Sequence, residues 1–189
     1  MRKLTFPFLL LFFIPLVLAA QDNSVTKLFQ EEKPLDIMLS FSIKEINKST
    51  NDTVYFPSTL KYKNVEGTWD SLPIGIRARG NFRRKNCGLP PLRIKIKKKD
   101  SQNTSFDGNR SLKLVLPCQT SAGYGTLIYK EYLCYQLYEP ITPYTFNTRL
   151  VNVTLNNQTG KSVKTNAVVG FFIEDDDLVA KRHNGKIIE

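Results

Sequence analysis

Histidine and cysteine, the side chains that most often hold transition metals, are scarce in this sequence. The chain of 189 residues contains one His and three Cys, namely Cys87, Cys118 and Cys134. No two cysteines have C-x-x-C spacing, which excludes a structural zinc site of the usual kind. In an oxidising compartment the three cysteines allow one disulfide and leave one thiol. The apolar patterns around Cys118 and Cys134 instead favour small, buried hydrophobic side chains there.

Long hydrophobic runs are absent apart from one at the amino terminus. Arg2 and Lys3 precede the apolar stretch Leu4–Leu18, and small residues follow up to Ala20. This pattern is typical of a cleaved secretory signal peptide. The alternative is a membrane anchor, but two prolines interrupt the stretch, which is near the lower length limit for a span. We expect residues 1–20 to be removed, leaving a secreted, periplasmic or cell-surface protein without a membrane span.

Acidic residues are missing from the segment Arg77–Lys99, which holds ten Arg and Lys residues. The whole chain has a formal net charge of +10. Such a segment suits a phosphate site, an anionic polymer or a solvated charged face. Because Phe82 is the one aromatic residue in the segment, base stacking has little support, and we expect no nucleic-acid partner.

Apolar residues alternate with polar ones along several segments, and this period of two predicts half-buried strands. Residues 21–33 read as a flexible lead-in, 34–175 as one α+β domain and 176–189 as a polar segment. The predicted strands are 35–43, 54–62, 72–79, 92–97, 111–116, 148–156 and 167–173.

One helix is predicted at 124–138, with Thr120 or Ser121 as its cap and Pro140 ending it. Residues 80–91 are predicted to form a loop, because two glycines and two prolines occur there. Short connections between neighbouring strands favour antiparallel pairing. The predicted fold is therefore a mostly antiparallel, twisted sheet with one main helix packed on it.

A carboxylate lies within an otherwise apolar or amphipathic stripe of this helix. Leu127, Glu131, Cys134 and Tyr138 share one helical face. If that face is buried, Glu131 requires a cationic partner. Lys113 on the preceding strand is one candidate, and Lys95 on the neighbouring strand is another. If the face is only partly covered, Glu131 reaches water.

Three stretches in this order resemble the spore-coat CotH kinase family, a group of secreted or surface proteins with an atypical kinase-like fold. The first is the sequence RARGN at 77–81, followed by LRIKI at 92–96. The second is FDGNRSLKLVL at 106–116, and the third is KEYL at 130–133 within the predicted helix. The resemblance covers roughly residues 70 to 175, a span of element-level similarity that does not by itself fix function.

The resemblance implies a sheet and helix like those of a protein-kinase small lobe, with ATP and Mg or another divalent metal as cofactors. It implies that Lys113 contacts the nucleotide phosphates and that Glu131 orients Lys113. Arg79, Arg83 and Lys95 are then further polyphosphate contacts. The expected partners are a nucleotide and a secreted protein substrate.

The acids that complete phosphoryl transfer lie in the large lobe of kinases, and this chain offers no counterpart, so its catalytic residues stay unknown. Asp175, Asp176 and Asp177 are consecutive, which makes them a poor metal cage and suggests a solvated acidic turn. We therefore expect an inactive amino-terminal fragment of a CotH-like kinase. The alternative function is a non-enzymatic secreted module that binds an anionic envelope polymer or polysaccharide.

Overall fold

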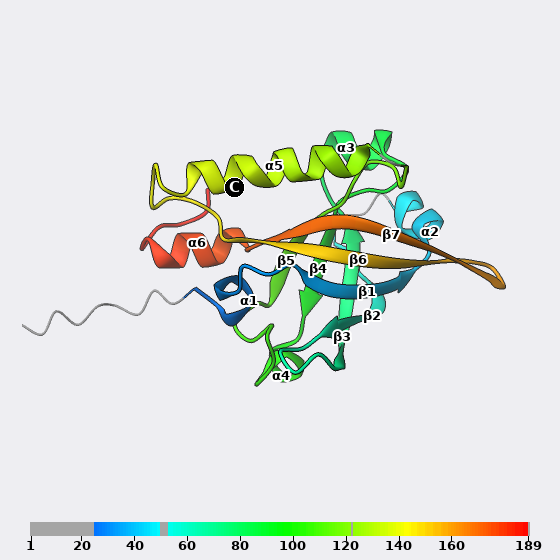
Figure 1. Cartoon of the computed structure of the whole chain (residues 1–189), viewed down its shortest axis with the longest axis horizontal. Helices are drawn as coiled ribbons and strands as arrows, with labels where there is room; N and C mark the ends of the chain where they lie inside the picture. Colours follow the sequence, from blue (N-terminus) through cyan, green and yellow to red (C-terminus); the bar gives the residue numbers. More distant parts are fainter. Residues whose placement is uncertain (1–24, 50–52, 122, 189) are drawn as a thin grey trace, which may run out of the picture.

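The protein folds as a closed barrel of seven strands in the computed structural model, which describes residues 25–49, 53–121 and 123–188 (Figure 1). The spatial order is β1-β2-β3-β4-β5-β7-β6, and β6 pairs with β1 to complete the circle. The strands are β1 Leu35–Phe41, β2 Phe56–Lys63, β3 Trp69–Ala78, β4 Leu92–Ile96, β5 Ser111–Val115, β6 Thr148–Thr159 and β7 Ser162–Ile173.

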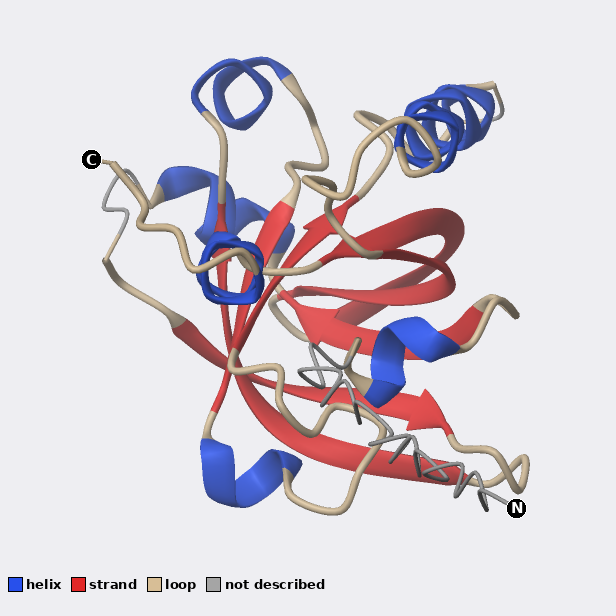
Figure 2. Cartoon of the chain, turned by 90° about the vertical axis from the view of Figure 1, so that its left-hand side faces the viewer, coloured by secondary structure: helices blue, strands red, loops and turns tan. Residues whose placement is uncertain are grey.

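The helices of the described part lie outside the layer of strands (Figure 2). They are α1 Lys27–Gln30, α2 Ile43–Lys48, α3 Asn81–Asn86, α4 Lys98–Ser101, α5 Tyr124–Tyr138 and α6 Asp176–Arg182. Only α5 exceeds two turns, and no helix among the described residues has the length and apolar character needed to span a membrane. The predicted signal peptide, residues 1–20, lies outside the described residues.

The predicted α+β fold, with a sheet and helix like those of a protein-kinase small lobe, is wrong. The sheet closes on itself because β1 runs parallel to β6, with pairs from Leu35–Val151 to Phe41–Asn157. The other six strand pairs are antiparallel. Alternating apolar residues reveal which side of a strand is buried, but they do not reveal a neighbour more than 100 residues away in the chain.

The barrel interior is filled by the apolar residues that alternate along the strands. Leu92 and Ile94 are fully buried and Ile96 is nearly so, as their alternation with Arg and Lys predicts. Phe106, from the loop between α4 and β5, enters this interior. Its ring packs edge-on against Tyr62 and Phe172 at centroid distances of 5.0 and 6.0 Å. Buried aromatic rings of this kind each contribute about 2 kcal/mol to stability.

Helix α5 spans the predicted residues 124–138 and lies across the outside of β7 (Figure 1). Tyr132 and Tyr135 both pack edge-on against Phe171, each with its ring centre 5.7 Å away. The predicted Thr120 or Ser121 cap is wrong, because the N-cap is Gly123 and no side chain caps it.

The loop predicted at 80–91 contains a short helix, α3, which a disulfide holds in place. Cys87 follows the last turn of α3 and is bonded to Cys118, just beyond β5. Cys134 is the remaining thiol and is exposed on α5. The prediction that Cys118 and Cys134 are buried hydrophobic residues is therefore wrong, while one disulfide and one thiol are confirmed. The disulfide fixes α3, which carries Arg83, beside the carboxyl end of β5.

Removing the disulfide by the double change Cys87→Ala and Cys118→Ala should lower the free energy of unfolding by about 3 kcal/mol. The reason is that a crosslink over 31 residues restricts the unfolded chain. Urea unfolding followed by circular dichroism measures this difference, with Cys134→Ala as the control that should leave stability unchanged. Equal stability of the double variant and the parent chain would contradict a structural disulfide.

Candidate functional site

Three cations form a row across the outer face of β3, β4 and β5. In the strand register, Arg77 lies opposite Arg93 and Arg93 lies opposite Lys113. The three side chains point away from the interior because their neighbours, such as Ile94 and Leu112, are fully buried inside it. Like charges placed directly opposite one another destabilise a sheet. The row therefore requires counter-charges.

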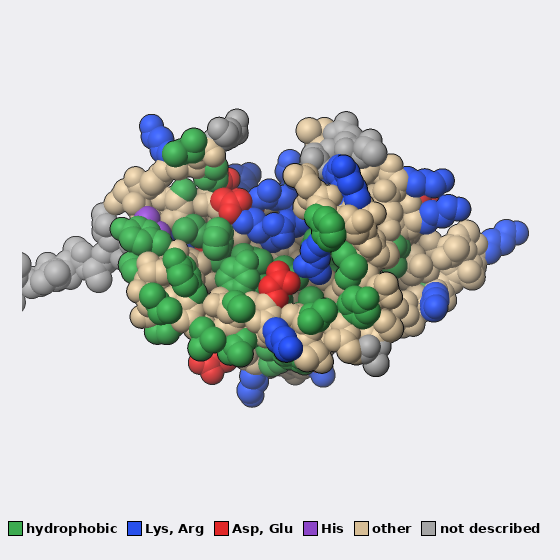
Figure 3. Space-filling model, turned by 90° about the horizontal axis from the view of Figure 1, so that it is seen from above, with side chains coloured by type: hydrophobic (Ala, Val, Ile, Leu, Met, Phe, Trp, Pro, Cys, Tyr) green, Lys and Arg blue, Asp and Glu red, His purple; other side chains and the backbone are tan. Residues whose placement is uncertain are grey.

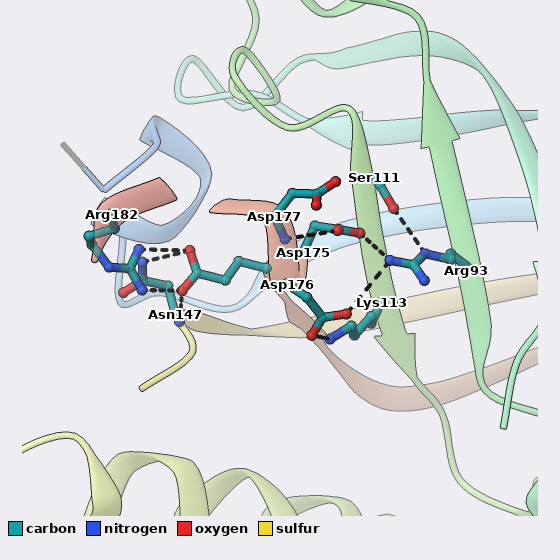
Figure 4. A network of polar contacts seen from close by, with 9 residues as sticks. Arg93, Ser111, Lys113, Asn147, Asp175, Asp176, Asp177 and Arg182 are labelled. Carbon is teal, nitrogen blue, oxygen red and sulfur yellow. Dashed lines mark hydrogen bonds and ion pairs between the residues drawn. The ribbon is translucent and has the colours of Figure 1, made fainter. Parts of the chain in front are cut away.

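The counter-charges come from the chain that follows β7 (Figure 4). Arg93 donates a hydrogen bond to Asp175, and Lys113 donates one to Asp176. The Lys113 ammonium group also lies 4.5 Å from the centre of the Phe146 ring. Lys113 is only 7% exposed, so its charge depends on one carboxylate and one aromatic face.

Asp175 is the most strongly held of these carboxylates. Burial opposes its ionisation, but hydrogen bonds from Ser111 and Arg93, the charge of Arg93 and the backbone N–H of Asp177 together lower its pKa. Asp175 also caps α6, because its side chain accepts a hydrogen bond from Asp177 N at 3.3 Å. One carboxylate thus joins β4, β5 and α6.

Arg79 extends the positive charge beyond the end of β3. Burial lowers the pKa of Arg79, and the positive charges of Arg93 and Arg83 act in the same direction, while Tyr135 and Asp176 act against them. Among the described residues Arg79 has no ion-pair or hydrogen-bond partner for its guanidinium group. A partly desolvated arginine that lacks an ion-pair partner and lies beside further cations attracts an anion.

Arg83 reaches the same surface from α3. Its guanidinium donates a hydrogen bond to the backbone oxygen of Leu116 and lies 3.4 Å from the Glu131 carboxylate on α5. The Glu131 side chain is 42% exposed, so this face of α5 is only partly covered and Glu131 reaches water. The structure pairs Glu131 with Arg83, and pairs Lys113 with Asp176 instead of Glu131.

Four of the five predicted nucleotide-binding residues lie around one surface, and the fifth, Lys95, lies further along β4 with its ammonium group 5.5 Å from the Tyr55 ring. The four are Arg79, Arg83, Lys113 and Glu131. We name four cations of this surface, Arg79, Arg83, Arg93 and Lys113, the basic cluster. Seen from the side of α5, Lys and Arg side chains gather in a hollow near the middle of the molecule (Figure 3).

The segment predicted as a solvated acidic turn is instead buried at its start, and that prediction is wrong. Glu174 is 2% exposed and Asp175 is 6% exposed. The Glu174 carboxylate accepts hydrogen bonds from Arg182 on α6, at 2.9 and 2.5 Å, and from the backbone N–H of Asn147 at 2.7 Å (Figure 4). The sequence signal for a helix here is Asp175 before a short apolar run, which is typical of an N-cap.

The described residues do not fit a divalent metal at this site. Within the described ranges there is no group of three or more His, Cys, Asp or Glu side chains that could hold one. Asp175 and Asp176 already accept hydrogen bonds from Arg93 and Lys113, and the neighbouring charges are positive. A metal would need carboxylate oxygens free of such partners.

In comparisons with known proteins, no family model, no curated protein and no solved structure matches this chain.

Asp175 should make stability depend on pH. Since its pKa is lowered from 3.8, its contribution is present above that value and is lost as the pH falls through the folded-state pKa. Asp175→Asn retains a capping side chain but removes the charge. Thermal unfolding should show a gap between the parent chain and this variant at neutral pH that narrows below about pH 4. Asp177→Asn, at an exposed neighbour, is the control; a gap that stays constant with pH would contradict the assignment.

Proposed function

We propose that the basic cluster binds the phosphate groups of a nucleotide, as the nucleotide-binding part of a secreted CotH-like kinase. The observation that supports this most is Arg79, a partly buried cation with no ion-pair partner among the described residues, flanked by Arg83 and Arg93. Burial makes such a cation costly to leave unpaired, and a phosphate can supply several acceptor oxygens at once.

The shape of the cluster supports a ligand with several negative charges. Its members come from β4, β5, α3 and the residue that follows β3, and Arg83 and Arg93 both lie close enough to Arg79 to lower its pKa. Arg83 is fixed by Leu116 O and by the nearby disulfide, and Arg93 is fixed by Asp175 and Ser111. Pre-positioned donors of this kind bind with little loss of side-chain entropy.

The basic cluster would bind and orient the nucleotide, and no bond-making step is assigned to it. Arg79 and Arg83 would contact phosphate oxygens directly, and Lys113 would do so after separating from Asp176. Glu131 would hold Arg83, and Asp175 would hold Arg93. Since no described group fits a metal, no step through a metal is assigned to these residues.

Lys113→Met and Arg79→Met should each weaken ATP binding at least about tenfold, because each removes one charge-assisted contact. Isothermal titration calorimetry of the whole chain measures the affinity, and inorganic triphosphate should compete. Lys161→Met, at an exposed turn between β6 and β7, is the control for loss of one positive charge. Unchanged ATP affinity in the Lys113 and Arg79 variants would overturn the proposal.

The same titration distinguishes the alternative function. If polygalacturonate, used as an anionic polymer probe, binds and Lys113→Met leaves its affinity unchanged while ATP does not bind, the polymer-binding function replaces the nucleotide proposal. Binding through dispersed charge weakens steeply with salt and is insensitive to any single lysine.

Asp176→Asn should strengthen ATP binding about fivefold, the equivalent of about 1 kcal/mol. In the absence of a ligand Asp176 forms an ion pair with Lys113. Its carboxylate therefore competes with a phosphate group for Lys113 and also repels that phosphate. Calorimetry at several salt concentrations should show the gain shrinking as salt rises. A weaker affinity in this variant would mean that Asp176 assists the ligand.

A further inference from the structure

A second, separate groove lies on the outer surface of the barrel beside α4. It has a volume of about 620 Å³ and opens along β2, β3 and β4. Prominent among its lining residues are Tyr55, Pro57, Pro73, Lys95, Lys97 and Lys99. We name it the lysine groove. It continues the outward face that carries Arg93, because Lys95 and Lys97 follow Arg93 at alternate positions of the chain.

Within the part of the chain that the structure describes, the three lysines of the groove have no carboxylate partner. None of them forms an ion pair with any residue in the described part of the chain. Asp100 is the one carboxylate among the described lining residues, and it forms no ion pair with them. The described lining residues therefore carry a net positive charge, three lysines against one aspartate, and an anionic ligand would neutralise it.

The wall opposite these lysines is mainly apolar. Pro57 and Pro73 contribute to it, and Gly75 leaves room for Tyr55, whose Cβ would lie only 3.1 Å from a side-chain carbon placed on Gly75. The Tyr55 ring is already engaged by two cations, with Arg77 at 5.3 Å and Lys95 at 5.5 Å from its centre. A sugar stacking on this ring would compete with these two cations, which favours a ligand that meets the lysines through its charges.

We propose that the lysine groove binds an extended acidic peptide with carboxylates at alternate positions. Alternate residues of an extended strand repeat at about 6.7 Å, and Lys95 and Lys97 are related by this repeat. An extended peptide has the same repeat, so two of its carboxylates meet two lysines. Its backbone and the aliphatic parts of its side chains lie against the two prolines. This binding does not require the nucleotide site.

Fluorescence anisotropy with two labelled peptides of equal composition tests the proposal. One has Glu at alternate positions with Val between them, and the other has its Glu residues consecutive. The alternating peptide should bind more tightly, and the double change Lys95→Glu and Lys97→Glu should weaken it at least about tenfold. The control is Lys161→Glu with Lys164→Glu, two exposed lysines of the β6–β7 hairpin, which should leave the affinity nearly unchanged.

Circular dichroism of each variant tests whether it is folded. If the Glu pair does not fold, the neutral pair Lys95→Gln and Lys97→Gln takes its place, and it should also weaken peptide binding. Lys113→Met should have no effect on the peptide, so failure of the nucleotide proposal and failure of this one are separate results. Equal affinity for the two peptides, an equal loss in the control pair, or displacement by polygalacturonate at lower concentration than the unlabelled peptide would each overturn the proposal.

Discussion

Arg77, Arg93 and Lys113 stand side by side on three hydrogen-bonded strands, and this row of like charges is the constraint on which the site depends. Such a row destabilises a sheet unless acids lie within a few ångströms of it. Asp175 and Asp176 supply them, but only if the end of β7 lies beside β5 and the chain then turns back. The network of Glu174 with Arg182 and Asn147 holds that turn in place. Electrostatics in the middle of the sheet thus determines where the carboxyl-terminal helix lies.

The positions of the strands and their buried faces could be predicted, whereas the closure of the sheet could not. Alternation in segments such as Leu92–Ile96 depends only on the local choice between water and interior, so it is visible in the sequence. Pairing of Leu35 with Val151 depends on the sum of strand twists around the barrel, which no short segment expresses. For this reason the sequence predicts a mostly antiparallel, twisted sheet with one main packed helix, whereas the structure is a closed barrel.

In the candidate site, too, some features are visible in the sequence and others depend on contacts between distant segments. The resemblance to the CotH family implies that Arg79, Arg83 and Lys113 contact one polyphosphate, and the structure places all three around one surface. Their partners were not predictable: the Lys113–Asp176 pair forms, and Glu131 pairs with Arg83. Consecutive acids resemble a solvated turn in the sequence, and only the location of Arg93 and Lys113 explains the burial of Asp175. Ion pairs follow distances in space, which the spacing of charges along the chain does not provide.

The parallel contact between β1 and β6 also has a consequence for folding. Partners such as Ile37 and Val153 are separated by 116 residues, so this pairing requires closure of a very long loop and raises the contact order of the fold. A nascent chain that lacks β6 and β7 leaves β1 and β5 as unpaired edges, which are prone to join other chains. The edge of β1 is covered only once synthesis has passed Asn157, and the edge of β5 only once it has passed Ile173, so the first five strands stay open at both edges until nearly the whole sheet has been made.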